Sequence, residues 1–143
     1  MSKIELVKLI NDWSKPLRED YYTADFQLTN AQGTPPMDRD SVLAMSELMQ
    51  SAMPDIRTVI EDFREEGNDV VLTSHWEGTF VNNFDLSAMG LGVIPATGKS
   101  VIFPTSTVRI SFDGDKISRL HDPATGPDAG MHGFLKALGA NGA

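Results

Sequence analysis

The sequence predicts an α+β domain in which helices pack on one side of a curved antiparallel sheet. Segments with the apolar spacing of helices dominate its first third, and segments with strand character follow. Glycine-containing turns at 66–68 and 113–114 join consecutive strands at hairpin distance. Helices first and antiparallel strands later indicate α+β. The 143 residues are enough for one domain with its own core, so residues 1–143 are expected to form a single domain.

The N-terminal part is expected to hold one helix and one strand. A helix should begin at residue 4, because Leu6, Leu9, Ile10 and Trp13 share one helical face, and Pro16 disfavours helical geometry just before it. Aromatic and β-branched residues predict a short strand over 21–29. The Asn, Gly and Pro content of 30–36 predicts a loop.

A second helix is expected to open at Asp38 and Asp40, where carboxylates suit both capping and the helix dipole. Its apolar residues repeat with helical spacing, and Pro54 ends it. This part of the chain is also rich in methionine, at Met37, Met45, Met49 and Met53.

The strands of the sheet are expected at 56–64, 70–80, 99–112 and 116–121. Pro104 lies within the third of these and requires an edge position or a bulge there. Residues 82–98 are expected to be irregular because of their three glycines and one proline, and 129–138 to form a short terminal helix.

Composition excludes several classes of function. The net charge of −8 and the pI near 4.7 argue against nucleic-acid binding, which depends on clusters of Lys and Arg. The chain has no cysteine, hence no disulfide and no thiolate site. No signal peptide and no apolar run of about 20 residues is evident, which predicts a cytoplasmic protein without membrane contact. The three histidines match no metal motif, and no dinucleotide fingerprint occurs, so no metal or cofactor is expected.

A series of short motifs resembles one family. In order they are Pro54-Asp55, the turn at Gly67, Trp76-Glu77-Gly78-Thr79, Thr97-Gly98-Lys99, and the stretch from Arg109 to Ile117. The series resembles the SnoaL-like polyketide (ester) cyclases of the nuclear-transport-factor-two-like superfamily. The resemblance implies a cone-shaped sheet wrapped around the N-terminal helices, with a deep apolar pocket for a small carbonyl-containing ligand. It also implies a homodimer formed through the sheet, and an Asp that acts as acid/base without a cofactor.

The family's acid/base residue cannot be placed at a single position. Family members carry a Trp after the last strand and an Asp about four residues later, whereas this chain has His121 and Thr125 at those offsets. Asp128 takes the role if the loop contains an insertion, and Asp122 is the nearest carboxylate otherwise. His121, Asp122 and Asp128 are therefore the candidate catalytic residues. The alternative is that Asp122 begins a turn and Asp128 caps the last helix.

Five residues are candidates for substrate binding, namely Tyr22, Met49, His75, Trp76 and Phe103. His75 and Trp76 must face opposite sides of their strand, and the sequence leaves open which side lines the pocket. A methionine in the second helix suits an adaptable pocket or ordinary core packing. Asn30 and Arg109 are further polar candidates. Arg109 is expected on the same strand face as Phe103, with a surface ion pair as its alternative role.

The leading hypothesis is a polyketide cyclase that closes a ring by an aldol-type reaction with acid/base catalysis. The alternatives are a non-catalytic protein that binds a small hydrophobic ligand, and an isomerase or hydratase on the same scaffold. All three require the same pocket, so the fold alone does not distinguish them.

Overall fold

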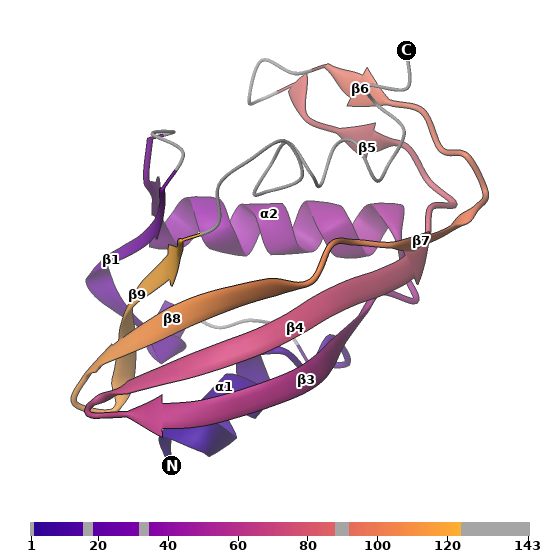
Figure 1. Ribbon diagram of the computed structural model, residues 1–143. Helices are drawn as coiled ribbons and strands as arrows, with labels where there is room; N and C mark the ends of the chain where they lie inside the picture. Colours follow the sequence, from indigo (N-terminus) through magenta and orange to yellow (C-terminus); the bar gives the residue numbers. More distant parts are fainter. Residues whose placement is uncertain (1, 16–18, 32–34, 88–91, 124–143) are drawn as a thin grey trace.

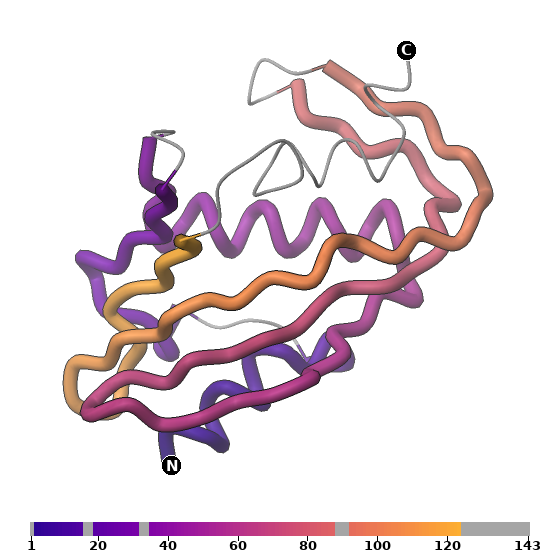
Figure 2. The backbone as a smooth tube through the Cα atoms, in the orientation of Figure 1, coloured from indigo at the N-terminus to yellow at the C-terminus, as the bar shows by residue number. Residues whose placement is uncertain are grey.

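Two helices pack against the inner face of a curled sheet in the computed structural model, which describes residues 2–15, 19–31, 35–87 and 92–123 (Figure 1). Helix α1 is Lys3–Ile10 and helix α2 is Arg39–Ala52. Strands β3, β4 and β8 run side by side, and Figure 2 shows the same arrangement in the path of the backbone. This is the α+β architecture predicted from the sequence.

The main sheet has seven strands within the described residues, in the order β2-β1-β9-β8-β4-β3, with β7 also paired to β4. Their bounds are Tyr22–Asn30 (β1), Met37–Asp38 (β2), Arg57–Glu66 (β3), Asp69–Thr79 (β4), Ser100–Ile102 (β7), Ser106–Asp113 (β8) and Lys116–Asp122 (β9). A 3-10 turn at Glu19–Tyr21 precedes β1.

Both helices begin at the caps that their sequences provide. Ser2 and Glu5 form a capping box at the start of α1, and the Asp38 carboxylate accepts the Ser41 N–H at 2.8 Å at the start of α2. Helix α1 ends at Ile10, earlier than the apolar spacing suggests. Trp13 therefore lies outside the helix, where its indole packs edge-on against Trp76.

The two hairpins close through two-residue loops that start with glycine. Glu66 pairs with Asp69 around Gly67, and Asp113 pairs with Lys116 around Gly114. Both glycines have positive φ, 62° and 63°, which only glycine adopts without strain. The turns predicted from the sequence are confirmed.

The long strand expected over 99–112 is divided at Pro104. Its two parts, β7 and β8, pair with the same neighbour, β4, on either side of the interruption. Proline has no N–H to donate to a strand ladder, so the break falls where the sequence places it.

Three features were not expected from the sequence. Strands β1 and β9 pair in parallel, whereas the other paired strands described here are antiparallel. The segment expected to be irregular contains a small two-stranded sheet of β5 (Phe84–Asp85) and β6 (Val93–Ile94). Met37 and Asp38 form β2, which extends the sheet beyond β1. The predicted helix at 129–138 and Asp128 lie outside the described residues.

Apolar side chains form two separate clusters on the inner face. The first joins the end of α2 to the β4–β7 end of the sheet and includes Met49, Phe80 and Phe103. The second joins α1 to the other end and includes Leu6, Leu72 and Ile110. Within the described part of the chain, no helix has the length and apolar character needed to span a membrane.

Candidate functional site

Strand β4 determines which predicted residues face the helices. Leu72 and Trp76 pack into the two apolar clusters, so the alternate residues Thr73, His75 and Glu77 lie on the outer face. His75 is thus separated by the sheet from Trp76 and from the inner face. The sequence did not say which of the two residues faces the helices. In the structure Trp76 packs against the core, and His75 lies on the opposite face.

The outer-face His75 lies between two carboxylates. Its Nδ1 is 3.0 Å from Glu61 Oε2, and its Nε2 is 3.0 Å from Glu77 Oε2. Glu61 is the extra residue of a β-bulge in β3, and the bulge places its carboxylate over β4. Glu61 also accepts a hydrogen bond from Thr105 Oγ1 at 2.9 Å, and Glu77 pairs with Arg57.

These contacts perturb the titration of all three groups. Hydrogen bonds to Glu61 and then to Glu77 raise the pKa of His75 above its ordinary value of 6.5. The pKa of Glu61 is lowered, mainly by His75 and then by Thr105, and that of Glu77 by His75 and then by Arg57. The arrangement is a network of charges on a sheet surface, not an enclosed apolar site.

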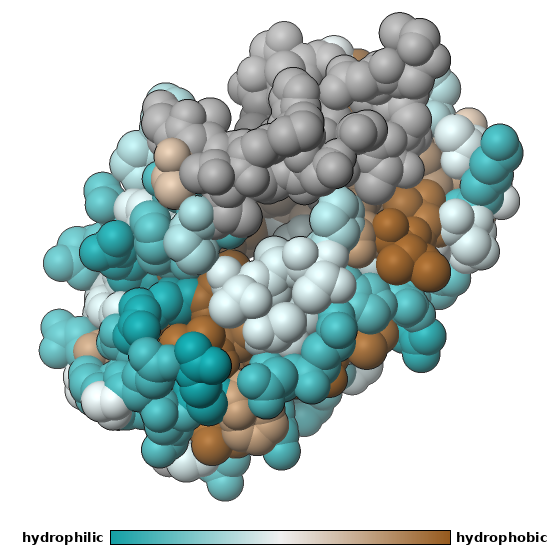
Figure 3. Space-filling view, in the orientation of Figure 1, coloured by the Kyte–Doolittle hydropathy of each residue, from teal (hydrophilic) through white to brown (hydrophobic). Residues whose placement is uncertain are grey.

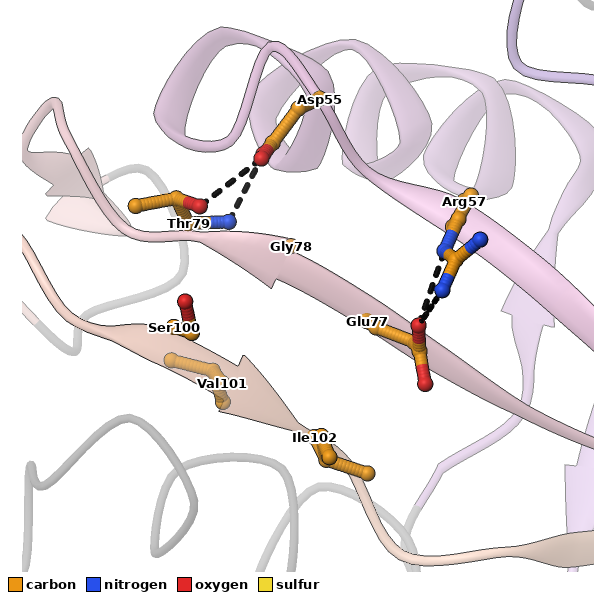
Figure 4. A pocket seen from close by; sticks show the side chains of 8 residues that line it. All are labelled: Asp55, Arg57, Glu77, Gly78, Thr79, Ser100, Val101 and Ile102. Carbon is orange, nitrogen blue, oxygen red and sulfur yellow. Dashed lines mark hydrogen bonds and ion pairs between the residues drawn. The ribbon is translucent and has the colours of Figure 1, made fainter.

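A small depression lies on the same outer face, at the β4–β7 end (Figure 4). Its volume is about 260 Å³, slightly below the usual range for ligand pockets. It is lined by Asp55, Arg57, Glu77, Gly78, Thr79, Ser100, Val101 and Ile102. Arg57 pairs with Glu77, and Asp55 accepts hydrogen bonds from the N–H and hydroxyl of Thr79 at 2.7 and 2.8 Å. Each charged group that lines the depression is therefore already held by another residue of the depression.

The inner face brings together three of the predicted substrate-binding residues. Trp76 stacks edge-on with Phe103, with ring centroids 6.3 Å apart, and both pack in the cluster that contains Met49. The Trp13 indole completes the row and donates a hydrogen bond to Thr58 Oγ1 at 2.8 Å. This row forms an apolar, aromatic wall beside the C-terminal half of α2.

Tyr22 lies in the other apolar cluster. It is 2% exposed, and its ring packs edge-on against Phe26 at 4.8 Å between centroids. Burial raises the pKa of its phenol well above the ordinary value. Tyr22 is therefore neutral at every physiological pH and is not part of the wall formed by Trp76 and Phe103.

Phe103 and Arg109 do not share a face, and the prediction that they do was wrong. Phe103 is buried, while Arg109 reaches Asp69 at 3.0 Å and Glu66 at 2.7 Å on the outer surface. The simple alternation assumed for one long strand fails because the chain is interrupted at Pro104. The surface ion pair considered for Arg109 is confirmed.

The end of β9 separates two of the predicted catalytic residues. Leu120 packs on the inner face, so His121 points outward and Asp122 inward. His121 Nδ1 lies 2.7 Å from Thr29 Oγ1. Asp122 pairs in register with Asn30 of β1, and its backbone carbonyl accepts the Ala31 N–H at 3.1 Å. His121 and Asp122 therefore cannot act as one dyad.

Asp122 and Asn30 place polar side chains at the rim of the inner face. Asn30 belongs to β1 and Asp122 to β9, and the parallel pairing holds them side by side. The carboxylate can accept a proton, and the amide can donate and accept hydrogen bonds. Asp128, the third predicted catalytic residue, lies outside the described residues.

The sequence reasoning overlooked two serines on the inner face, Ser74 of β4 and Ser106 of β8. The signal was available, because Ser74 interrupts the apolar series Val70, Leu72, Trp76 on alternate residues.

No cluster of three or more His, Asp or Glu suited to a metal ion occurs among the residues that the structure describes.

Comparisons with known proteins agree with this fold. No curated protein matches the chain at a significant level. Two crystal structures each have a TM-score of 0.69. One is a "Putative SnoaL-like polyketide cyclase" from Jannaschia sp. CCS1, at 16% identity over 96% of this chain and 91% of that chain. The other is AclR, "a putative hydroxylase" from Streptomyces galilaeus, at 19% identity over 96% of this chain and 92% of that chain. A protein "with ketosteroid isomerase-like protein fold" from Catenulispora acidiphila has a TM-score of 0.64, at 11% identity over 97% and 92%.

These identities are too low to carry over an activity, and the three descriptions name different reactions or none. The family model for the SnoaL-like domain, by contrast, matches residues 12–120 of the chain itself, from before β1 to the inner-facing Leu120 of β9. This protein therefore belongs to the SnoaL-like domain family.

Proposed function

We propose that the protein is an enzyme that acts on an apolar carbonyl compound without a cofactor, with Asp122 as the acid/base. One observation carries the proposal: Asp122 is an inward-facing carboxylate at the rim of a largely apolar inner face, beside Asn30. A carboxylate next to an apolar site can take a proton from a carbon acid when the substrate excludes water.

The proposed reaction is an intramolecular aldol-type ring closure. The carboxylate of Asp122 accepts a proton from a carbon between two carbonyl groups, and the C–H electron pair becomes an enolate. The enolate carbon attacks a second carbonyl carbon, a C–C bond forms, and the π electrons move to that oxygen. The resulting alkoxide takes the proton back from Asp122. The product is an isomer of the substrate, so no oxidant or reductant is consumed.

The wall formed by Trp76, Phe103 and Met49 would hold the substrate's apolar body. Aromatic rings at fixed angles and a flexible thioether suit a flat polycyclic compound. Orientation of both carbonyls near Asp122 is then the main contribution of the protein. His75 and His121 lie on the outer face and have no part in this mechanism.

The test is a pair of titrations with a panel of aromatic polyketide esters and steroid-like ketones, following binding and turnover separately. Asp122→Asn should abolish turnover and keep binding, because the amide preserves size but cannot accept the proton. Asp128→Asn makes the same change at the other candidate acid/base residue. Loss of turnover in Asp128→Asn alone would move the role to Asp128. Binding without turnover in the wild type would instead support a non-catalytic protein for hydrophobic ligands.

We also propose a homodimer formed through the outer face of the sheet, as the family resemblance implies. Ile102 supports it, since this side chain is 70% exposed on β7. Much of the face seen in Figure 3 is hydrophilic, and one of its hydrophobic patches lies at the β7 end of the sheet. Sedimentation of the wild type and of Ile102→Ser should show a dimer that the variant weakens, and a wild-type monomer would contradict the proposal.

A further inference from the structure

Two serines face each other across β4 and β8 on the inner face. Ser74 and Ser106 are direct register partners in this antiparallel pair, so their side chains point to the same side. Ser74 is 8% exposed and, apart from Tyr22, is the only buried side chain with a hydroxyl, amide or charged group among the residues that the structure describes. Both hydroxyls can donate and accept hydrogen bonds.

The serines lie at the boundary between the two apolar clusters. On β4, Ser74 stands between Leu72 and Trp76. Leu72 belongs to the second apolar cluster, which joins α1 to the sheet, and Trp76 packs on the first, which joins the end of α2 to the sheet. On the neighbouring strand, Ser106 stands between Val108, which packs on the same cluster as Leu72, and Phe103, which belongs to the same cluster as Trp76. The polar interruption therefore crosses two strands at one level of the sheet. A position inside an apolar surface where two adjacent strands both carry hydroxyls is suited to a ligand oxygen.

Ser106 of this pair lies on the strand next to that of Asp122. Ile110 pairs with Leu120, so continuation of the β8–β9 register places Val108 beside Asp122. Ser106 is two residues from Val108 along β8. Ser106 and Asp122 therefore lie on neighbouring strands and on the same face of the sheet, two residues apart along the strand direction. A single small substrate can span that distance.

We propose that Ser74 and Ser106 form the element that binds the substrate's carbonyl oxygen. This inference rests on the function proposed above and specifies which groups recognise its substrate. When Asp122 removes the proton, negative charge develops on the carbonyl oxygen, and the serine hydroxyls donate hydrogen bonds to it. Such donors act most strongly where charge develops in a water-excluded site. The pair favours ketones and esters over compounds of the same shape without an oxygen.

Rigid probes test the recognition step without requiring turnover. Fluorenone and fluorene share a tricyclic shape, but only fluorenone has the ring carbonyl. The wild type should bind fluorenone about tenfold more tightly than fluorene, the size expected of one or two net hydrogen bonds. The double variant Ser74→Ala/Ser106→Ala should bind the two probes equally. Failure of the wild type to prefer fluorenone, including failure to bind either probe, would overturn the inference.

The chain supplies a matched control on the other side of the sheet. Thr73 and Thr107 are the next register pair, and their hydroxyls are 2.9 Å apart on the outer face. Thr73→Val/Thr107→Val removes two hydroxyls from the same strands and should leave the preference for fluorenone unchanged. An equal loss in the threonine variant would also overturn the inference, since the effect would then be one of sheet stability.

The outcomes separate this inference from the proposed catalysis. A preference for fluorenone that disappears in the serine variant supports the serine element even if no substrate is turned over. Turnover that depends on Asp122 but is unchanged in Ser74→Ala and Ser106→Ala would keep the enzyme and remove the serines from it. If both proposals hold, each serine variant should lower kcat by about 10-fold or more on an active substrate.

Discussion

The imidazole of His75 and the carboxylate of Glu61 are joined at 3.0 Å on the outer face of the sheet, and Glu77 holds the opposite ring nitrogen at the same distance. A neutral imidazole can donate through only one nitrogen. Two carboxylate partners therefore require the doubly protonated imidazolium form. The cation lies between two anions on neighbouring strands, and the network extends to Arg57 through Glu77.

The His75 network predicts a stability optimum in mildly acidic solution. The pKa of His75 is raised, so its contribution is complete below about pH 6.5 and is lost as the pH rises through the folded-state pKa. The pKa values of Glu61 and Glu77 are lowered. Their contribution to stability is therefore complete above about pH 4.5 and is lost as the pH falls through their folded-state pKa values. All three groups contribute between about pH 4.5 and 6.5.

Urea unfolding at pH 6 and pH 8 checks this prediction. The wild type should lose stability between these values, and His75→Gln should lose less, because glutamine does not titrate. His121→Gln serves as a control on the same face. Parallel pH curves for the wild type and His75→Gln would show that the contacts to Glu61 and Glu77 do not form in solution.

Substitutions of Ile102, the last residue of β7, and of Phe103, which follows it, should differ greatly in their effect on stability. Phe103 is 3% exposed and packs against Trp76, whereas Ile102 is 70% exposed on the other face. Phe103→Ala should lower the free energy of unfolding by about 3–5 kcal/mol. Measured on the monomer, at protein concentrations too low for association, Ile102→Ala should change it by no more than about 0.5 kcal/mol. Denaturant unfolding of both variants measures the difference, and similar losses would contradict the assignment of Phe103 to the core and Ile102 to the surface.

Two glycines should resist substitution for different reasons. A Cβ at Gly78 would lie 3.2 Å from Met53 Cβ and 3.3 Å from the backbone Cα of Ile56, so Gly78→Ala should cost about 1–3 kcal/mol. A Cβ at Gly114 would have no heavy atom within 4 Å, so only the φ of 63° opposes a side chain there. Gly114→Ala should therefore cost about 1–2 kcal/mol. Asn tolerates positive φ, so Gly114→Asn should be milder than Gly114→Ala. Gly78→Asn should instead be worse than Gly78→Ala, and thermal unfolding of the four variants tests both orders.

Adjacent residues at the end of β9 should respond differently in ligand experiments. Asp122 faces inward and His121 outward, so His121→Gln should leave binding and turnover near the wild-type level. Asp122→Asn should lower kcat by about 100-fold or more, within the usual range for loss of a general acid or base. Steady-state kinetics on the active member of the ester and ketone panel gives both values. A large loss of kcat in His121→Gln would contradict the assignment of faces.

Much of the fold was predictable because local signals determine it. Asp38 caps α2, Gly67 and Gly114 close the hairpins, and Pro104 interrupts a strand, and each of these effects involves residues close together in the chain. The parallel pairing of β1 with β9 was not predictable in this way, since it joins residues about ninety positions apart and no turn connects them.

The site was less predictable than the fold because it depends on which side of the sheet a residue faces. Alternation separates His75 from Trp76 but does not say which of them meets the helices. The expected shared face of Phe103 and Arg109 was wrong because a break near one proline changes the alternation. Ser74 and Ser106 were overlooked since serine is common on exposed strands, and only the register between β4 and β8 brings the two together.

The parallel pairing of β1 and β9 also affects the order in which the protein can form during synthesis. Strand β1 ends at Asn30 and pairs only with the two-residue β2 and with β9, among the strands described here. A ribosome adds about 5–20 residues per second, so Tyr22–Asn30 waits several seconds until residues 116–122 have left the exit tunnel. During that interval Phe26 has no sheet to cover it, and a nascent chain held at this stage is a natural substrate for chaperones.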